Sequence, residues 1–154
     1  GVGTVIQAYL RRTADDVATM LAEGPTNLRL CKGIYRESEE VAFQDREEVR
    51  TSFKELLTQL FEGGATRVGI ATHDDLLVED ALEQIERLDV PKERYEFQML
   101  LGVTERIRDR LVAAGHPLRV YVPFGQDWFP YSIRRLRENP QIAGHVIKGL
   151  FTRG

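Results

Sequence analysis

Two adjacent arginines near the carboxyl end of the chain could bind a small anion. Arg134 and Arg135 would diverge by about 100° on a helix, so two guanidinium groups could hold one carboxylate from two directions. Glu138 lies four residues after Arg134 and shares its helix face. Tyr131 adds the aromatic surface that a small-molecule pocket needs. The alternative interpretation is a solvated basic helix face with one ion pair.

A second set of polar and small residues falls where apolar runs end. Its members are Gln7, Arg29, Lys32, Gly33, Thr72, His73, Gln98 and Tyr121. Buried amides and charges are costly without hydrogen bonds, so their recurrence at successive strand ends favours one shared polar site. Each also has a structural explanation, because Arg29 could form an ion pair and residues 72–74 are typical of a helix N-terminus.

The elements that must position these residues follow from the hydrophobic pattern. We predict strands at residues 4–9, 27–31, 67–71, 95–99 and 118–122 and helices at residues 13–22, 46–62 and 75–88, with helices after the last two strands. Nearly continuous apolar strands separated by helices are typical of a parallel sheet, so the predicted class is α/β. Periodicity alone does not choose between a doubly wound sheet and part of a (β/α)₈ barrel.

Composition and charge restrict the functional classes. The 154 residues are 42% hydrophobic and 29% charged, which is ordinary for one globular domain, and a net charge of -3 gives no reason to expect nucleic acid as a partner. The single cysteine and three scattered histidines show no metal-ligand spacing. Nucleotide-binding glycine motifs, nucleophile elbows and long apolar runs are also lacking in the sequence.

Five motifs resemble, in order, those of the proline dehydrogenase family in its bacterial monofunctional type. They are Arg29-Leu30-Cys31-Lys32-Gly33-Ile34-Tyr35, Ala71-Thr72-His73, Glu96-Phe97-Gln98, Tyr121-Val122-Pro123-Phe124-Gly125 and Tyr131-x-x-Arg134-Arg135-Leu136-x-Glu138-Asn139. The resemblance implies a (β/α)₈ TIM-type barrel. Residues 1–154 would be its carboxyl-terminal part, strands four to eight and the last helix, and the amino-terminal half of the barrel would be a missing partner.

The activity implied by the resemblance is a flavin-dependent oxidation of L-proline. Hydride transfer to the flavin would give Δ1-pyrroline-5-carboxylate, electrons would pass to a quinone, and the pathway would be proline catabolism. The implied cofactor is FAD, with FMN as the alternative. We expect a cytoplasmic protein with peripheral contact to the inner face of the membrane. Another flavin barrel enzyme, such as a methylenetetrahydrofolate reductase, and a truncated non-catalytic α/β module are the alternatives.

Roles for individual residues also follow from the resemblance. Arg134, Arg135 and Glu138 resemble the residues that bind the proline carboxylate, and Tyr121, Tyr131 and Leu100 resemble the walls around the substrate ring. The expected flavin contacts are Gln7, Arg29, Lys32, Gly33, Thr72, His73 and Gln98. Among them Arg29 is expected beside the reactive edge of the flavin, as the catalytic residue. No metal is expected.

Overall fold

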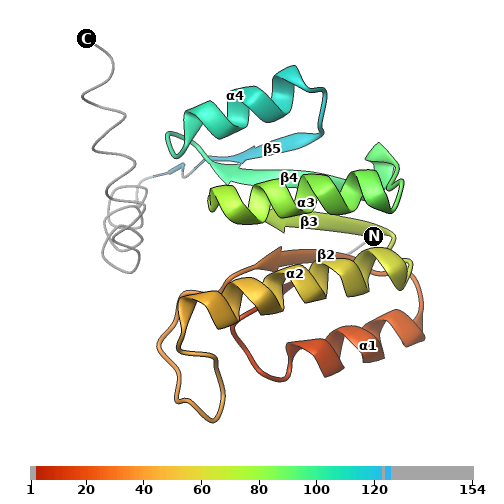
Figure 1. The fold of residues 1–154 in the computed structure, drawn as a ribbon, viewed down its shortest axis with the longest axis vertical. Helices are drawn as coiled ribbons and strands as arrows, with labels where there is room; N and C mark the ends of the chain where they lie inside the picture. Colours follow the sequence, from red (N-terminus) through yellow and green to blue (C-terminus); the bar gives the residue numbers. More distant parts are fainter. Residues whose placement is uncertain (1–2, 123, 126–154) are drawn as a thin grey trace.

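The computed structural model describes residues 3–122 and 124–125, in which a parallel sheet alternates with helices (Figure 1). The strands are β1 (Thr4–Gln7), β2 (Asn27–Cys31), β3 (Arg67–Ala71), β4 (Tyr95–Leu100) and β5 (Leu118–Tyr121). The helices are α1 (Thr13–Glu23), α2 (Arg46–Glu62), α3 (Asp75–Arg87) and α4 (Glu105–Ala113), with a short 3₁₀ helix, η1 (Lys92–Arg94), before β4.

The order of the strands decides the architecture. The sheet runs β1-β2-β3-β4-β5, and every neighbouring pair is parallel. A doubly wound sheet reverses its strand order and carries helices on both faces, whereas these helices lie on one face (Figure 1). The predicted α/β class is confirmed, and the sequential order is that of a (β/α)₈ barrel wall.

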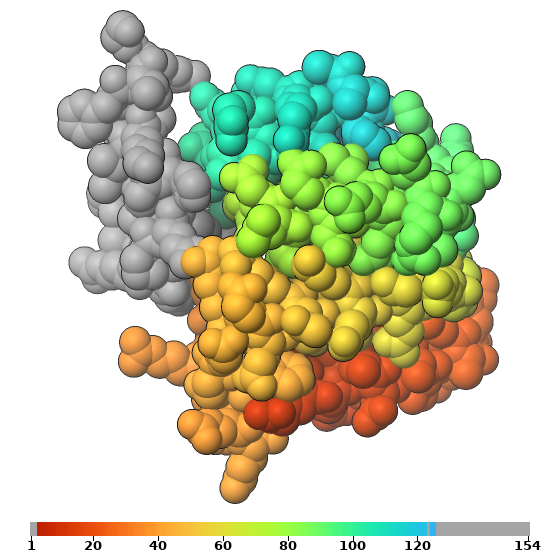
Figure 2. Space-filling model, viewed as in Figure 1, coloured from red at the N-terminus to blue at the C-terminus, as the bar shows by residue number. Residues whose placement is uncertain are grey.

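The core lies between the sheet and its helices. Alternate strand residues such as Leu28, Leu30 and Ile70 are fully buried there, against Phe53 and Leu57 of α2. Figure 2 shows the helices as neighbouring bands that follow the chain order. Because side chains alternate along a strand, the residues between the core positions face the opposite side of the sheet, where polar groups collect.

Two negative findings concern the described residues alone. No helix among residues 3–122 is both long and apolar enough to span a lipid bilayer. The same part of the chain contains no group of three His, Cys, Asp or Glu side chains close enough to hold a metal ion.

Candidate functional site

A cavity of about 730 Å³ lies at the carboxyl ends of the five strands. Small-molecule sites are typically of this size, and barrel enzymes place them at this end of the sheet. The cavity is lined by every predicted site residue that the structure describes: Gln7, Arg29, Lys32, Gly33, Thr72, His73, Gln98, Leu100 and Tyr121. Four further predicted residues, Tyr131, Arg134, Arg135 and Glu138, lie outside the described residues.

Beneath the cavity lies a hydrogen-bonded group that we call the floor cluster: Arg29, Arg67, Glu96, Gln98 and Arg119. Arg29 Nε donates to Gln98 Oε1 at 2.7 Å, and Gln98 Nε2 donates to Glu96 Oε1 at 2.7 Å. Arg67 donates to Glu96 Oε2 at 2.7 Å, while Arg119 donates to both carboxylate oxygens, at 2.7 and 3.1 Å. The floor cluster therefore joins β2, β3, β4 and β5 across the inner face of the sheet.

The carboxylate of Glu96 remains ionised although the residue is only 6% exposed. Burial by itself raises the pKa of Glu96, but hydrogen bonds from Arg119, Gln98 and Arg67 outweigh burial and lower the pKa to about 2. A buried charge without such partners would cost several kcal/mol. Glu96 is therefore an acceptor, never a proton donor, at neutral pH.

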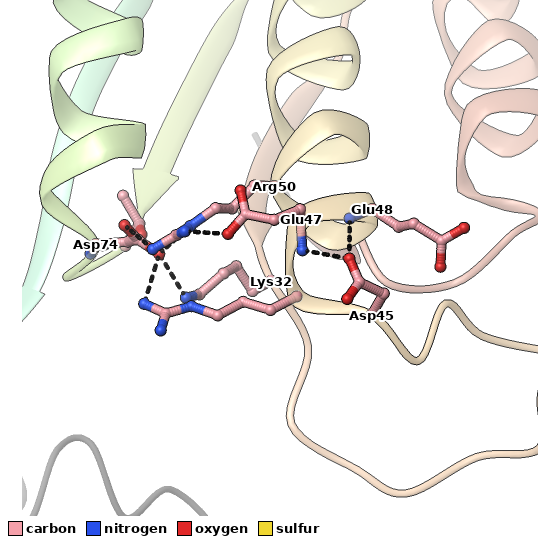
Figure 3. Close-up of polar contacts among 8 residues, drawn as sticks. Lys32, Asp45, Glu47, Glu48, Arg50 and Asp74 are labelled. Carbon is pink, nitrogen blue, oxygen red and sulfur yellow. Dashed lines mark hydrogen bonds and ion pairs between the residues drawn. The ribbon is translucent and has the colours of Figure 1, made fainter.

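A second group, the mouth cluster, consists of Lys32, Arg46, Glu47, Arg50 and Asp74 (Figure 3). Asp74 accepts from Lys32 Nζ at 3.0 Å and from Arg50 Nε and Nη2 at 2.9 and 3.1 Å. Arg46 forms a longer ion pair with Asp74 at 3.7 Å, and Glu47 pairs with Arg50. Three cations thus surround two carboxylates at the rim, which leaves the mouth cluster with a net positive charge.

The start of α2 positions the two arginines of the mouth cluster. Asp45 caps this helix, because its Oδ1 accepts from the backbone N–H groups of Glu47 and Glu48 at 2.8 and 3.1 Å (Figure 3). Arg46 and Arg50 are then four residues apart on one helix face, and both reach Asp74 at the start of α3.

Asp74 precedes α3 but does not cap it. The residue occupies the N-cap position, as the pattern at residues 72–74 suggested, yet its side chain makes no capping hydrogen bond. Thr72 Oγ1 accepts from the Asp74 backbone N–H at 3.2 Å. The Asp74 carboxylate accepts from Lys32 and Arg50 and from no backbone N–H of α3. Burial alone raises the pKa of Asp74, but these two cations lower it to about 2.

His73 ties the end of β3 to the end of β4. The backbone N–H of Leu100 donates to His73 Nε2 at 3.1 Å, so the ring proton of the neutral imidazole must lie on Nδ1. His73 Nδ1 lies 2.9 Å from the hydroxyl of Thr104 and donates to it. The side chain is therefore held in one orientation at the cavity wall.

Gly33 is required by both conformation and packing. Its φ of 102° lies in the region that disfavours side chains. A Cβ at this position would come within 2.1 Å of the ring of Tyr9. Tyr9 is hydrogen-bonded in turn, through its backbone, to Lys32 and Phe43 at 2.9 and 2.8 Å. The loop after β2 is thus held against β1, beside the cavity that Lys32 and Gly33 line.

The sequence reasoning missed four residues that hold the site together: Arg46, Arg50, Asp74 and Glu96. A signal for Glu96 was present, because it precedes Gln98 by two residues and so shares its strand face. The pattern at residues 72–74 places Asp74 among the polar residues that follow β3 and predicts a helix start there, but it does not predict the ion pairs of Asp74 with Lys32 and Arg50. Arg46 and Arg50 carry no comparable signal, since basic residues on a helix are usually solvated.

Comparisons with known proteins agree on one family. The sequence profile of proline dehydrogenase matches residues 1–148. Proline dehydrogenase 1 of Bacillus subtilis (strain 168) is 43% identical over 97% of this chain and 49% of its own length. The proline dehydrogenase of Deinococcus radiodurans is 36% identical over 97% of this chain and 47% of its own. The chain therefore spans about half the length of these curated relatives.

A solved structure extends the likeness to three dimensions. Proline utilization A from Bdellovibrio bacteriovorus, crystallised after inactivation by N-propargylglycine, superposes with a TM-score of 0.80 at 31% identity. The match covers 89% of this chain and 16% of that protein. Sequence and structure together show that this chain belongs to the proline dehydrogenase family.

Proposed function

We propose that residues 1–154 form the carboxyl-terminal part of a barrel that oxidises L-proline to Δ1-pyrroline-5-carboxylate with a bound flavin. The observation that carries the proposal is the convergence of all nine described site residues on one cavity, in a chain of this family. Family membership also removes the alternative of a methylenetetrahydrofolate reductase. A non-catalytic α/β module remains as the outcome that the experiment below distinguishes.

The cavity residues suit a flavin in charge and in hydrogen-bonding groups. The net positive mouth cluster could balance the phosphate groups of FAD, with Lys32 and the cavity-lining Gly33 as contacts. Deeper in the cavity, Gln7 and Gln98 offer the amide groups that a heterocyclic ring needs. We propose FAD ahead of FMN because the resemblance to the proline dehydrogenase family implies FAD.

Arg29 is proposed as the residue that acts on the reaction itself. Its Nε is occupied by Gln98, while its terminal nitrogens form no hydrogen bond with any residue that the structure describes. Flavin supplies the hydride-accepting chemistry of this reaction. A guanidinium group beside the ring would stabilise the negative charge that develops as the hydride is transferred.

Substrate binding is proposed for the part of the cavity that is lined by Tyr121 and Leu100, which could form walls around the pyrrolidine ring. Arg134 and Arg135 are proposed to bind the carboxylate in bidentate fashion, with Glu138 orienting them and Tyr131 adding a further wall. Holding proline by its carboxylate would fix which ring carbon meets the flavin, and such orientation can contribute about 7–11 kcal/mol.

The remaining parts of the proposal concern partners. Strands β1 and β5 are the edges of the described sheet, and a (β/α)₈ barrel needs three more strands to join them. We propose the amino-terminal half of the barrel as the partner that closes it. Electrons would pass to a quinone, which implies peripheral contact between a cytoplasmic protein and the inner face of the membrane.

An anaerobic absorbance experiment tests the proposal. FAD is titrated into the purified protein, and L-proline is then added. A bound flavin whose visible band bleaches on addition of proline supports the proposal. Bound flavin that does not bleach assigns the missing contacts to the absent half of the barrel, and the absence of any binding favours the non-catalytic module.

Two substitutions test the carboxylate clamp, by which we mean the proposed binding of the proline carboxylate by Arg134 and Arg135. In the full-length enzyme, Arg134→Met and Arg135→Met should each raise the KM for proline at least about tenfold while flavin stays bound, because one of two charge-assisted contacts is lost. Tyr121→Phe should have a smaller effect. An unchanged KM in both arginine variants would remove the clamp from the proposal.

A further inference from the structure

The floor cluster connects a charged residue outside the cavity to the arginine that lines it. Arg29 is on β2 and Gln98 on β4, so the hydrogen bond between them crosses the whole width of β3. Gly69 is the β3 residue paired with both Arg29 and Glu96. A Cβ on Gly69 would lie 2.5 Å from Gln98 Nε2. The glycine therefore leaves the space through which Gln98 reaches Arg29.

The chemistry of the partners allows only one orientation of the Gln98 amide. Glu96 is ionised and can only accept, so it must face the NH2 group of Gln98. Arg29 can only donate, so it must face the amide oxygen. A flipped amide would place oxygen against carboxylate and NH2 against guanidinium. The orientation of the Gln98 amide therefore follows from these two neighbours, because Glu96 can only accept and Arg29 can only donate.

We propose that Glu96 is a positioning residue that fixes Arg29 toward the cavity by orienting Gln98. The inference deepens the proposed function and rests on it for the role of Arg29. A purely structural ion-pair cluster would need only Glu96, Arg67 and Arg119, which already pair with one another across β3, β4 and β5. The additional bond to Gln98 extends the cluster into the cavity, and its removal would leave the Arg29 side chain without a preferred direction.

The first test observes Arg29 directly and needs no flavin. In the ¹⁵N-labelled protein, the Nε–H signal of Arg29 is identified by its loss in Arg29→Lys. We expect it to be protected from solvent exchange in the unsubstituted protein. In Glu96→Ala the exchange of this Nε–H should become roughly tenfold faster or more, because the Gln98 amide that accepts its hydrogen bond is free to turn. Glu79→Gln, at an exposed ion pair with Arg110, is the matched control and should leave the signal unchanged.

A conservative variant keeps the test decisive if Glu96→Ala fails to fold. Glu96→Gln keeps the size of the side chain but replaces a group that can only accept with an amide that can also donate, so the Gln98 amide is no longer held in one orientation. Faster exchange of the Arg29 Nε–H in Glu96→Gln supports the proposal. Full protection in folded Glu96→Ala or in folded Glu96→Gln overturns it.

FAD titration of the same variants separates this inference from the proposed function. If Arg29 loses protection in Glu96→Gln and FAD affinity falls roughly tenfold in the same variant, both stand. If protection is lost in Glu96→Gln but none of the proteins binds FAD, the positioning role holds and the proposed function fails. If FAD binds the protein while Arg29 is unprotected throughout, the positioning role fails alone.

Discussion

The mouth and floor clusters each contain one buried carboxylate, Asp74 or Glu96, and both carboxylates remain ionised. They differ in what surrounds them. Asp74 accepts from cations on the loop after β2 and on α2, whereas Glu96 accepts from Arg67 and Arg119 on the two neighbouring strands and from Gln98 on its own strand. Arg50, the main partner of Asp74, is only 12% exposed, while Arg67 and Arg119 are 42% and 64% exposed.

This contrast indicates different consequences when either carboxylate is lost. A guanidinium group with little exposure cannot turn toward water, so removal of Asp74 leaves the buried Arg50 with Glu47 as its remaining partner among the described residues. The side chains of Arg67 and Arg119 are more exposed and can rehydrate, so removal of Glu96 should disturb orientation more than stability. Both clusters join elements together, and we expect the mouth cluster to contribute more to stability.

The largest expected effect tests this contrast in stability. Asp74→Ala should lower the free energy of unfolding by about 3–5 kcal/mol, because it removes the buried carboxylate that both Arg50 and Lys32 contact and leaves Arg50 with Glu47 alone. Glu96→Ala should lower it by about 1–2 kcal/mol, since its charged partners are half exposed. Urea denaturation followed by circular dichroism measures both. Equal losses, or a larger loss for Glu96→Ala, would contradict the contrast.

The next effect concerns the space that the floor cluster needs. Gly69→Ala should cost about 1–3 kcal/mol, because the new Cβ meets the Gln98 amide and not because of backbone strain. Truncation of Gln98 removes that contact. In a double-mutant cycle, Gly69→Ala should therefore cost much less in the Gln98→Ala background, measured by the same denaturation. Additive costs would show that Gly69 is needed for another reason.

Acid should weaken both clusters in the same pH window. The pKa values of Asp74 and Glu96 are lowered to about 2, so the unfolded chain binds more protons than the folded one at acid pH. Stability from these groups is present above about pH 5 and is lost as pH falls toward 2, with a slope of up to about 1.4 kcal/mol per pH unit for each group. Asp74→Asn and Glu96→Gln should each flatten the measured dependence of unfolding free energy on pH; an unchanged slope in both would contradict the assignment.

The smallest expected effect distinguishes the two arginines of the mouth cluster by their contribution to stability. Arg46→Gln should change the free energy of unfolding by less than about 1 kcal/mol, because this side chain is 54% exposed and 3.7 Å from Asp74. Arg50→Gln should cost clearly more. Thermal and urea unfolding of the pair measure the difference. A larger effect for Arg46 would mean that the outer ion pair, not the inner one, holds α2 against α3.

The sequence predicted most of the fold and the membership of the cavity. The predicted bounds of β2, β3 and α2 coincide with those observed, and β1 ends two residues earlier than expected, at Gln7. These elements follow from hydrophobic period, which depends on near neighbours in the chain. The nine described site residues could be predicted because strand ends in a parallel sheet share one edge, and because the motifs resemble those of a known family.

The connections among the site residues were decided by the tertiary structure alone. Whether Glu96 meets Arg67 and Arg119 depends on the register between strands, and whether Arg50 meets Asp74 depends on how α2 packs beside α3. Sequence period specifies the face of an element on which a residue lies but not the residue opposite it. The sequence by itself therefore determined nine of the residues that line the cavity, whereas tertiary packing brought Arg46, Arg50 and Asp74 to it and determined which side chains hold one another in place.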